Sequence, residues 1–314
     1  MKLVITIPAY NEEKTIGAVI REIPGKIAGV GKAEVLVIDD GSTDSTAEAA
    51  MREGAKVMRN ITNKGLAFSF ARGLEEALGM GADIIVNTDA DFQYDQSEIP
   101  ALVKPILEGR ADIVLGSRFK GRIEYMPAQK YWGNKAMSFM VRFLTGLAIS
   151  DAQTGFRAFS RDAALKVNIF SGYTYTQETI LEAWEKGLTI IEVPVTFRKR
   201  DGPSRLISSI FVYARRAGFT VFETYLNYKP LKVFLSIGAV LIVAGLALGL
   251  RVLVHFLNTG LVEPYLPSAI LSSMLVIVGL QVSVIGLAAK MLQRVRVTQE
   301  RLLYEAKRAR LDGK

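Results

Sequence analysis

Short apolar runs alternate with amphipathic stretches along the chain, up to about residue 116. The runs contain consecutive Val, Ile and Leu residues, which is typical of strands buried on both faces of a sheet. A regular alternation of strand and helix predicts an α/β fold, in which helices cover both faces of a mostly parallel sheet. The predicted strands are residues 3–8, 34–38, 57–58, 83–88 and 112–116. One predicted helix ends near residue 23, and the next is capped by Ser42 or Thr43 with Asp44 in its first turn. The other predicted helices run from 63–65 to about 79, over 97–108 and from 177 to about 186.

Two long apolar segments occupy much of the last third of the chain. Residues 231–255 and 267–289 are each long enough to cross a hydrocarbon core of about 30 Å at ~1.5 Å per residue. The connecting residues 256–266 contain no Lys or Arg, whereas basic clusters in 198–216 and 293–314 flank the pair on its outer sides. The positive-inside rule then predicts that both termini are cytoplasmic. A pair of buried core helices is the alternative, which these lengths disfavour.

The pattern divides the chain into a cytoplasmic domain of α/β type, a membrane-surface helix, a transmembrane hairpin and a basic cytoplasmic tail. The surface helix is predicted because residues 205–226 place apolar side chains at helical spacing beside several arginines, with an ordinary domain-packing helix as the alternative. Small residues in the spans permit close helix packing and are compatible with a homo-oligomer. The predicted boundaries are 1–204, 205–230, 231–292 and 293–314.

The amino-acid composition limits the kinds of metal site and catalytic site that the chain can form. The chain has no Cys, and its single histidine, His255, lies inside an apolar stretch. Disulfides, thiolate metal sites, His-based zinc sites and Ser-His-Asp triads are therefore excluded. The net charge of +8 is concentrated beside the apolar segments, so it indicates a membrane surface and no nucleic acid. We expect an integral membrane protein, in the plasma membrane of a prokaryote or in an ER-type membrane.

Three of the predicted strands end in acidic sequences, namely Asn11-Glu12, Asp39-Asp40 and Asp89-Ala90-Asp91. The carboxyl ends of parallel strands meet at one edge of the sheet, where ligands bind. Clustered acids are costly unless a cation or hydrogen-bond donors offset their repulsion. Asp89 and Asp91 alone would fit a solvated turn, but three such ends together favour a site for Mg²⁺ or Mn²⁺ with a diphosphate. Neither a G-x-G-x-x-G sequence after the first strand nor a P-loop is present.

Several motifs, in order and spacing, resemble those of the family 2 glycosyltransferases of GT-A fold. The resemblance covers roughly residues 3–206. With the two apolar spans, the sequence is most similar to the polyprenyl- and dolichyl-phosphate glycosyltransferases, the subgroup of dolichyl-phosphate mannose synthase. The matching segments are Pro8-Ala9-Tyr10-Asn11-Glu12, Asp39-Asp40-Gly41-Ser42-Thr43-Asp44, Asn63-Lys64-Gly65, Asp89-Ala90-Asp91-Phe92-Gln93, Gly116-Ser117-Arg118, Asp151-Ala152-Gln153-Thr154-Gly155-Phe156-Arg157 and Arg200-Asp201-Gly202-Pro203-Ser204-Arg205.

The resemblance implies an inverting, metal-dependent transfer of a hexose from a nucleotide-diphosphate sugar to a membrane polyprenyl or dolichyl phosphate. The donor would be GDP-mannose, UDP-glucose or UDP-GlcNAc, and the cofactor Mg²⁺ or Mn²⁺. Another lipid or polysaccharide acceptor is the alternative. A processive synthase is disfavoured by the absence of a Q-x-x-R-W motif, and a pyrophosphorylase by the absence of a G-x-G-T-R-like loop. A non-catalytic scaffold that binds nucleotide sugar is disfavoured by the intact Asp89 and Asp91.

The same resemblance assigns residues to roles. Asp89, Asp91 and Gln93 would hold the metal, and Arg118, Lys130 and Asn134 would bind the lipid phosphate. Asp89, Asp91, Arg118 and Asp151 would be the catalytic residues, with Asp151 either a base or an orienting group. The nucleotide-sugar site would consist of Pro8, Tyr10, Asn11, Glu12, Asp39, Asp40, Gly41, Lys64, Asp89, Ala90, Asp91, Gln93, Arg200 and Arg205.

Overall fold

The computed structural model of the chain describes residues 1–169, 175–199, 226 and 229–312. The chain divides into two compact units, one formed by Met1–Val221 with Tyr304–Lys314 and the other by Phe222–Leu303. Arg200, Arg205 and nearly all of the predicted surface helix over 205–226 lie outside the described residues.

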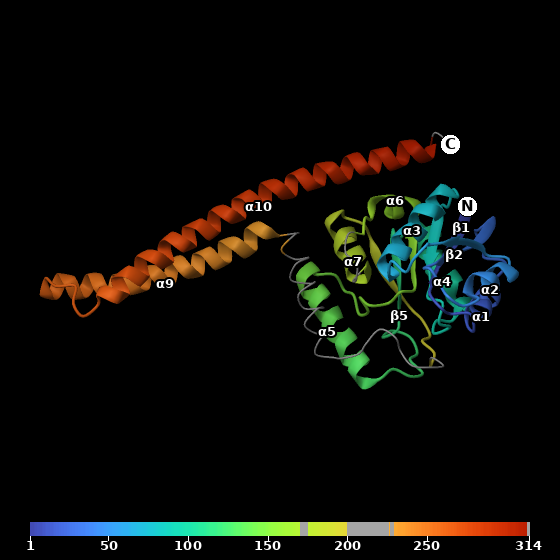
Figure 1. Cartoon of the computed structure of the whole chain (residues 1–314), viewed down its shortest axis with the longest axis horizontal. Coiled ribbons are helices and arrows are strands. Elements are labelled where there is room, and N and C mark those ends of the chain that lie inside the picture. The colour runs from blue at the N-terminus through green and yellow to red at the C-terminus, as the bar shows by residue number, and fades with distance from the viewer. Residues whose placement is uncertain (170–174, 200–225, 227–228, 313–314) are drawn as a thin grey trace. The chain divides into compact units, whose positions relative to one another are not determined.

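A sheet of mostly parallel strands forms the centre of the first unit (Figure 1). In its described part the strand order is β3-β2-β1-β4-β6-β5-β7. β1 pairs in parallel with β2 and β4, β2 with β3, and β5 with β7, whereas β6 is antiparallel to both β4 and β5. The predicted α/β fold is confirmed, and β6 and β7 are additions to it. The strands are β1 (Lys2–Ala9), β2 (Lys32–Asp39), β3 (Lys56–Arg59), β4 (Ile84–Asn87), β5 (Ile113–Ser117), β6 (Arg157–Ser160) and β7 (Ile190–Pro194).

Helices cover both faces of this sheet, which explains why its central strands are continuously apolar. One face is covered by α1 (Ile16–Glu22), α2 (Thr46–Arg52) and α4 (Ile99–Leu107), the last preceded by a short 3₁₀ turn, η1 (Gln96–Glu98). The other face is covered by α3 (Leu66–Gly79), α5 (Ala128–Thr145), α6 (Arg161–Lys166) and α7 (Tyr175–Glu185).

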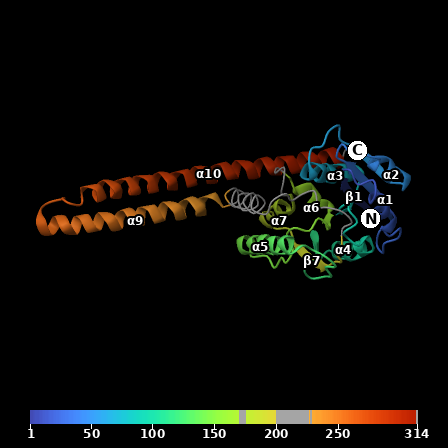
Figure 2. The same cartoon turned by 60° about the horizontal axis from the view of Figure 1, so that its bottom comes forward.

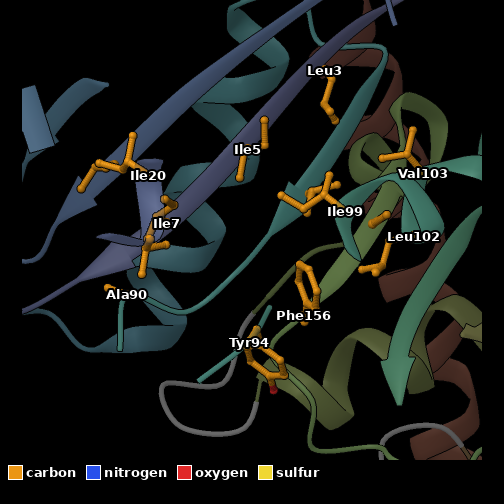
Figure 3. Packing of buried hydrophobic residues seen from close by; sticks show 14 of the residues in the cluster. Leu3, Ile5, Ile7, Ile20, Ala90, Tyr94, Ile99, Leu102, Val103 and Phe156 are labelled. Atoms are coloured by element: carbon orange, nitrogen blue, oxygen red, sulfur yellow. The ribbon is translucent and has the colours of Figure 1, made fainter. Parts of the chain in front are cut away.

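β1 shows how the sequence produces this layering. Its alternate residues Leu3, Ile5 and Ile7 are fully buried and pack toward α1 and α4 (Figure 3). Val4 points to the opposite face, into the cluster formed with α3 and α6. Since both faces of the strand are covered, a run of aliphatic residues is stabilised at every position, by about 1.5–3 kcal/mol for each fully buried side chain.

The sheet brings the three acidic strand ends together. β2, β1 and β4 are neighbours in that order and run parallel, with Ala9 opposite Asp39 and Thr6 opposite Asn87. The chain therefore leaves all three strands at the same edge, and the loops that begin at Tyr10, Asp40 and Thr88 lie next to one another. The adjacency expected from the sequence is confirmed.

The second unit is a helical hairpin of α9 (Pro230–Thr259) and the first part of α10 (Leu266–Asp312), which lie side by side (Figure 2). Both helices are long and apolar enough to cross a membrane. Small residues allow their backbones to approach closely. A Cβ placed on Gly279 would lie 2.8 Å from the carbonyl oxygen of Gly238, and the Ser272 hydroxyl donates a hydrogen bond to the Gly245 carbonyl at 2.7 Å. The glycines of the spans therefore hold the hairpin together.

The last turns of α10 belong to the first unit. The Tyr304 hydroxyl donates a hydrogen bond to Asp162 at 3.0 Å, and the Lys307 ammonium donates one to the Asn168 side chain at 2.9 Å. Leu311 packs against the same apolar cluster as α3 and α6. The end of α10, from Tyr304 to Asp312, thus docks on the α/β domain, a contact that the sequence pattern does not reveal.

Candidate functional site

The loops after β1 and β2 are joined by hydrogen bonds between their polar residues. The Asn11 amide N–H donates to the Ser42 hydroxyl at 2.9 Å, and the Asn11 side-chain oxygen accepts from the Thr43 amide at 2.8 Å. The Glu12 amide donates to the Thr46 hydroxyl at 2.9 Å. Asn11 has a φ of 54°, a left-handed conformation that asparagine tolerates better than most residues. These polar residues therefore fix the shape of the sheet edge.

Asp39 is fully buried at the end of β2. Its Oδ1 accepts a hydrogen bond from the Ser42 amide at 2.9 Å, and its Oδ2 lies 3.2 Å from the Arg59 Nε in an ion pair. That Oδ2 has no hydrogen-bond partner within the described chain. A buried acceptor of this kind is usually satisfied by a partner, which a ligand hydroxyl or N–H would supply.

Asp40, the next residue, is occupied by the protein itself. Its carboxylate accepts hydrogen bonds from the Asn60 side chain and from the amides of Lys64 and Gly65, at 2.7 to 3.0 Å. Gly41 has a φ of +74°, and a Cβ there would lie 2.8 Å from the Thr62 backbone. Asp40 and Gly41 thus hold the loop that leads into α3.

Asp89 and Asp91 follow β4 on either side of the buried Ala90. The Asp91 carboxylate accepts a hydrogen bond from the Gln93 amide at 3.2 Å, and the Gln93 side chain donates one to the Arg198 carbonyl at 3.3 Å. The Asp89 carboxylate lies against the α-carbon of Gly155. The structure therefore brings the end of β4 against the segment that begins at Asp151.

Oxygen atoms of Asp89, Asp91 and Gln93 are those that a divalent cation would take at this edge. No group of three or more His, Cys, Asp and Glu side chains suited to a metal is present in the described part of the chain. Two carboxylates fit the preference of Mg²⁺, and of the similarly oxygen-seeking Mn²⁺, for a few protein oxygens completed by phosphates and water. A cation held in this way needs the diphosphate for its remaining positions.

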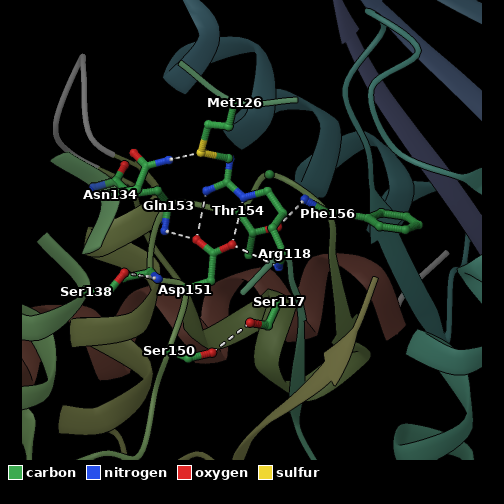
Figure 4. Close-up of polar contacts among 12 residues, drawn as sticks. Ser117, Arg118, Met126, Asn134, Ser138, Ser150, Asp151, Gln153, Thr154 and Phe156 are labelled. Atoms are coloured by element: carbon green, nitrogen blue, oxygen red, sulfur yellow. Dashed lines mark hydrogen bonds and ion pairs between the residues drawn. The ribbon is translucent and has the colours of Figure 1, made fainter. Parts of the chain in front are cut away.

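Arg118 and Asp151 form a buried ion pair (Figure 4). The Arg118 Nε and Nη2 donate to the two Asp151 oxygens at 2.7 and 2.8 Å, and the Arg118 amide adds a third bond at 3.0 Å. Burial alone would lower the pKa of the guanidinium, but Tyr94 and Asp151 raise that pKa above its ordinary value. Arg118 therefore stays charged, with its planar group held in one orientation.

α5 adds two more of the predicted residues to this region. The Lys130 ammonium and the Arg118 guanidinium lie over the ring of Phe197, at 5.4 and 5.1 Å from its centroid. Asn134 is buried, and its amide lies 3.9 Å from the Met126 sulfur (Figure 4). Arg118, Lys130 and Asn134, which are far apart in sequence, are thus gathered at the end of β5.

Three residues without a predicted role hold the segment from Ser150 to Gly155. The buried Glu192 carboxylate on β7 accepts from the Ser150 and Asp151 amides at 2.8 and 2.9 Å and pairs with Lys120 at 3.0 Å. The Ser138 hydroxyl on α5 accepts from the Ala152 amide at 2.9 Å. An acid inside the apolar run of β7 is the sequence signal that could have pointed to Glu192.

Arg157 is the third of these residues and is fully buried. Its guanidinium donates to the carbonyls of Ala152, Thr154 and Thr176 and to the Thr179 hydroxyl, at 2.7 to 3.0 Å. Burial lowers the pKa of Arg157 to about 10, against the opposing influence of Tyr175 and Asp151. The charge therefore persists at neutral pH, and Arg157 joins the Asp151 segment to the start of α7.

Pro8, Tyr10 and Lys64 lie at the sheet edge formed by the ends of β1, β2 and β4 and the loops that follow them. Pro8 is buried in β1, Tyr10 is 38% exposed, and Lys64 is exposed with its ammonium 4.6 Å from the Phe68 ring centroid. The structure thus has two groups at one sheet edge. One surrounds β1, β2 and β4, and the other surrounds Arg118 and Asp151.

Comparisons with known proteins identify the family of the chain. The model of glycosyl transferase family 2 matches residues 4–167, and that of the glycosyltransferase family 2 C-terminal transmembrane region matches residues 210–293. The UDP-N-acetylglucosamine–dolichyl-phosphate N-acetylglucosaminyltransferase of Methanococcus voltae is 34% identical over 61% of this chain and 83% of that protein. Glycosyltransferase AglJ of Haloferax volcanii is 29% identical over 96% of this chain and 97% of its own length.

A solved structure supports the fold. Glucosyl-3-phosphoglycerate synthase of Mycobacterium tuberculosis, in complex with Mn²⁺, UDP and glucosyl-3-phosphoglycerate, is similar with a TM-score of 0.54 and 23% identity over 72% of this chain and 78% of that one. The family model covers more than half of the 314 residues. The chain belongs to glycosyl transferase family 2 and is a glycosyltransferase.

Proposed function

We propose that the enzyme transfers a hexose, with inversion, from a nucleotide-diphosphate sugar to a polyprenyl or dolichyl phosphate. The observation that carries the proposal is the pair of groups at one sheet edge. The acids after β4 stand beside a buried, charge-paired Arg118, to which α5 adds Lys130. A donor diphosphate with its cation fits the first group, and an acceptor phosphate fits the second.

The donor would occupy the edge of β1, β2 and β4. The unsatisfied Asp39 Oδ2 would accept a hydrogen bond from the base or the ribose. Tyr10 and Pro8 would line the base pocket, and Asn11 and Glu12 would shape it through their bonds to the β2 loop. Asp40 and Gly41 would contribute by holding the loop of Lys64 in place.

Asp89, Asp91 and Gln93 would hold Mg²⁺ or Mn²⁺ on the diphosphate. When bound, the cation would stabilise the negative charge of the departing nucleotide diphosphate. The protein residues would fix the diphosphate so that the anomeric carbon faces Arg118. Through its bond to the Arg198 carbonyl, Gln93 would also connect the cation site to the residues that directly precede Arg200 in the chain.

The acceptor phosphate would lie between Arg118, Lys130 and Asn134. A phosphate is ionised at neutral pH, so it can attack without a strong general base. Both Asp151 oxygens accept hydrogen bonds from Arg118. This arrangement favours an orienting role for Asp151: it holds the guanidinium toward the phosphate and balances its charge.

The outer face of α5 supports a lipid acceptor. Trp132, Phe139 and Phe143 are 70, 59 and 78% exposed. Lys135 and Arg142 stand on the same helix. Large aromatic residues mixed with basic ones are typical of protein surfaces at the headgroup level of a membrane. We therefore propose that α5 lies at the headgroup level of the membrane that holds the acceptor, so that Lys130 and Asn134 meet a phosphate whose lipid tail remains in the bilayer.

The test is transfer from radiolabelled GDP-mannose, UDP-glucose or UDP-GlcNAc to polyprenyl phosphate, using the full chain in liposomes with Mg²⁺ or with Mn²⁺. One donor should yield a lipid-linked sugar. Failure of all three donors with both cations would contradict the proposal.

A matched pair of variants connects this activity to the acids after β4. Asp91→Asn should lose turnover, whereas Asp83→Asn, at the exposed opposite end of the same strand, should retain it. Retained turnover in Asp91→Asn would rule out the proposed cation site. A non-catalytic scaffold would produce no lipid-linked sugar in any of these preparations.

A further inference from the structure

Gly155 and Asp89 are in closer contact than any side chain on residue 155 would allow. A Cβ built on Gly155 would lie 2.6 Å from the Asp89 Oδ1, 2.9 Å from Oδ2 and 3.0 Å from Cγ. Real Cβ atoms essentially never approach within 3.0 Å of another heavy atom. The Asp89 carboxylate therefore occupies the space that a methyl group would fill.

The segment around Gly155 has little freedom to retreat. The Asn87 side chain donates to the Gly155 carbonyl at 2.8 Å, and the Gly155 amide donates to the Tyr94 hydroxyl at 3.1 Å. Asn87 and Tyr94 are both fully buried. The Tyr94 ring packs between Phe156 and Phe197, with centroids 5.1 and 5.4 Å away. A Cβ on Gly155 would therefore displace Asp89 more readily than the backbone.

Backbone conformation does not require the glycine. Gly155 is not among the glycines with a positive φ, so alanine can adopt its backbone angles without strain. The conformational freedom of glycine thus gives no reason for its presence here, whereas the contact with Asp89 does.

We infer that Gly155 is a positioning residue for Asp89: the absence of a side chain at 155 sets where the first cation-binding carboxylate stands. The inference rests on the proposed function, because it assumes that Asp89 binds the divalent cation. It also implies that one segment serves both groups of the site, since Asp151 at its start orients Arg118 and Gly155 near its end places Asp89.

The experiment compares Mn²⁺ binding by the full-length wild type, Gly155→Ala and Gly79→Ala, followed by electron paramagnetic resonance with and without UDP. Gly79, near the end of α3, has open space around its Cβ position and is the matched control. Mutation of a residue that orients a metal ligand typically weakens metal binding about 10- to 100-fold, which we expect for Gly155→Ala in the presence of UDP. UDP affinity without metal should be unchanged, and Gly79→Ala should bind Mn²⁺ like the wild type.

The outcomes separate the inference from the function on which it rests. A wild type that binds no Mn²⁺ with UDP would contradict the proposed cation site itself. A wild type that binds Mn²⁺, matched by a folded Gly155→Ala, would overturn the positioning role alone. Should Gly155→Ala fail to fold, Tyr94→Phe decides, because it adds no atom and removes the acceptor that anchors Gly155. Weakened Mn²⁺ binding by Tyr94→Phe would support the inference, and unchanged binding would overturn it.

Discussion

The two groups of polar residues at the sheet edge are built in different ways. Around β1, β2 and β4, carboxylates are held mainly by backbone amides close by in the fold, as Asp39 is by Ser42 and Asp40 by Lys64 and Gly65. Around Arg118 and Asp151, charged side chains bind one another, as Arg118 binds Asp151 and Lys120 binds Glu192, or bind buried carbonyls, as Arg157 does. The first group is a set of capped loops, and the second is a charged core.

The two groups should therefore differ in how well they tolerate substitution. A hydrogen bond from a backbone amide does not depend on the side chain of the residue that donates it. The loops around β1, β2 and β4 therefore fix the acids but leave the neighbouring side chains freer to vary. In the charged core each group depends on a particular partner, because an unpaired charge at full burial is costly. The group around Arg118 and Asp151 should therefore respond more strongly to substitution than the group around β1, β2 and β4.

The largest effect is expected from Asp151→Asn. It would leave the buried Arg118 without its counter-charge, which typically costs about 3–5 kcal/mol of stability when a buried pair is broken. Transfer activity should also fall by two orders of magnitude or more, as when a preorganised charge is lost from a catalytic site. Melting temperature in detergent and the transfer assay measure the two effects.

A double variant separates pairing from catalysis. Arg118→Met combined with Asp151→Leu removes both charges and should recover much of the stability lost in Asp151→Asn, because apolar residues can replace a buried pair. It should remain inactive. If Asp151→Asn has the same melting temperature as the wild type, the ion pair of Arg118 and Asp151 does not behave as a buried pair of charges.

Much of the group around β1, β2 and β4 could be predicted from the sequence, for a physical reason. A strand, its terminal acid and the capped loop that follows are consecutive, so Asp39 and Asp89 reveal their place by the apolar runs before them. Parallel pairing of neighbouring strands then brings their ends together. Predictions from such local patterns need no knowledge of distant contacts.

The group around Arg118 is predictable mainly through family resemblance. The resemblance brings Arg118, Lys130 and Asn134 together as a set, but no local pattern indicates that α5 carries two of them to the end of β5. β6 escaped prediction because it has four residues and begins with Arg157, a residue type rarely found fully buried. Its burial is compensated by carbonyls of two segments that meet after folding, the segment from Ser150 to Gly155 and the start of α7.

Arg157→Lys tests whether those carbonyls matter. A lysine ammonium lacks the planar fork that reaches four acceptors, so at least one of the buried carbonyls of Ala152, Thr154 or Thr176 would be left unsatisfied. The cost is expected to be about 1–3 kcal/mol, smaller than for Asp151→Asn because a positive charge remains. Thermal unfolding measures it, with the partly buried Arg161→Lys as the control. Equal melting of Arg157→Lys and the wild type would show that the segment is held without this guanidinium.

The smallest effect should come from a charge cluster on the surface, at the start of β2. Hydrogen bonds from Lys32 and then Lys56 lower the pKa of Glu34 from its ordinary 4.5 to about 2, although burial opposes them. A carboxyl whose folded-state pKa is depressed contributes stability above its unfolded pKa and loses it as the pH falls toward its folded pKa. The contribution is therefore complete above about pH 5 and disappears between 4.5 and about 2.

Because both lysines are largely exposed, Glu34→Gln should cost no more than about 1 kcal/mol at pH 7, and less in high salt. The melting temperatures of the wild type and Glu34→Gln should converge as the pH is lowered from 5 to 3. A difference in melting temperature as large as that of Asp151→Asn, or one that persists in acid, would contradict this comparison. It would show that burial is not the reason why the charges of Arg118 and Asp151 are more sensitive to substitution.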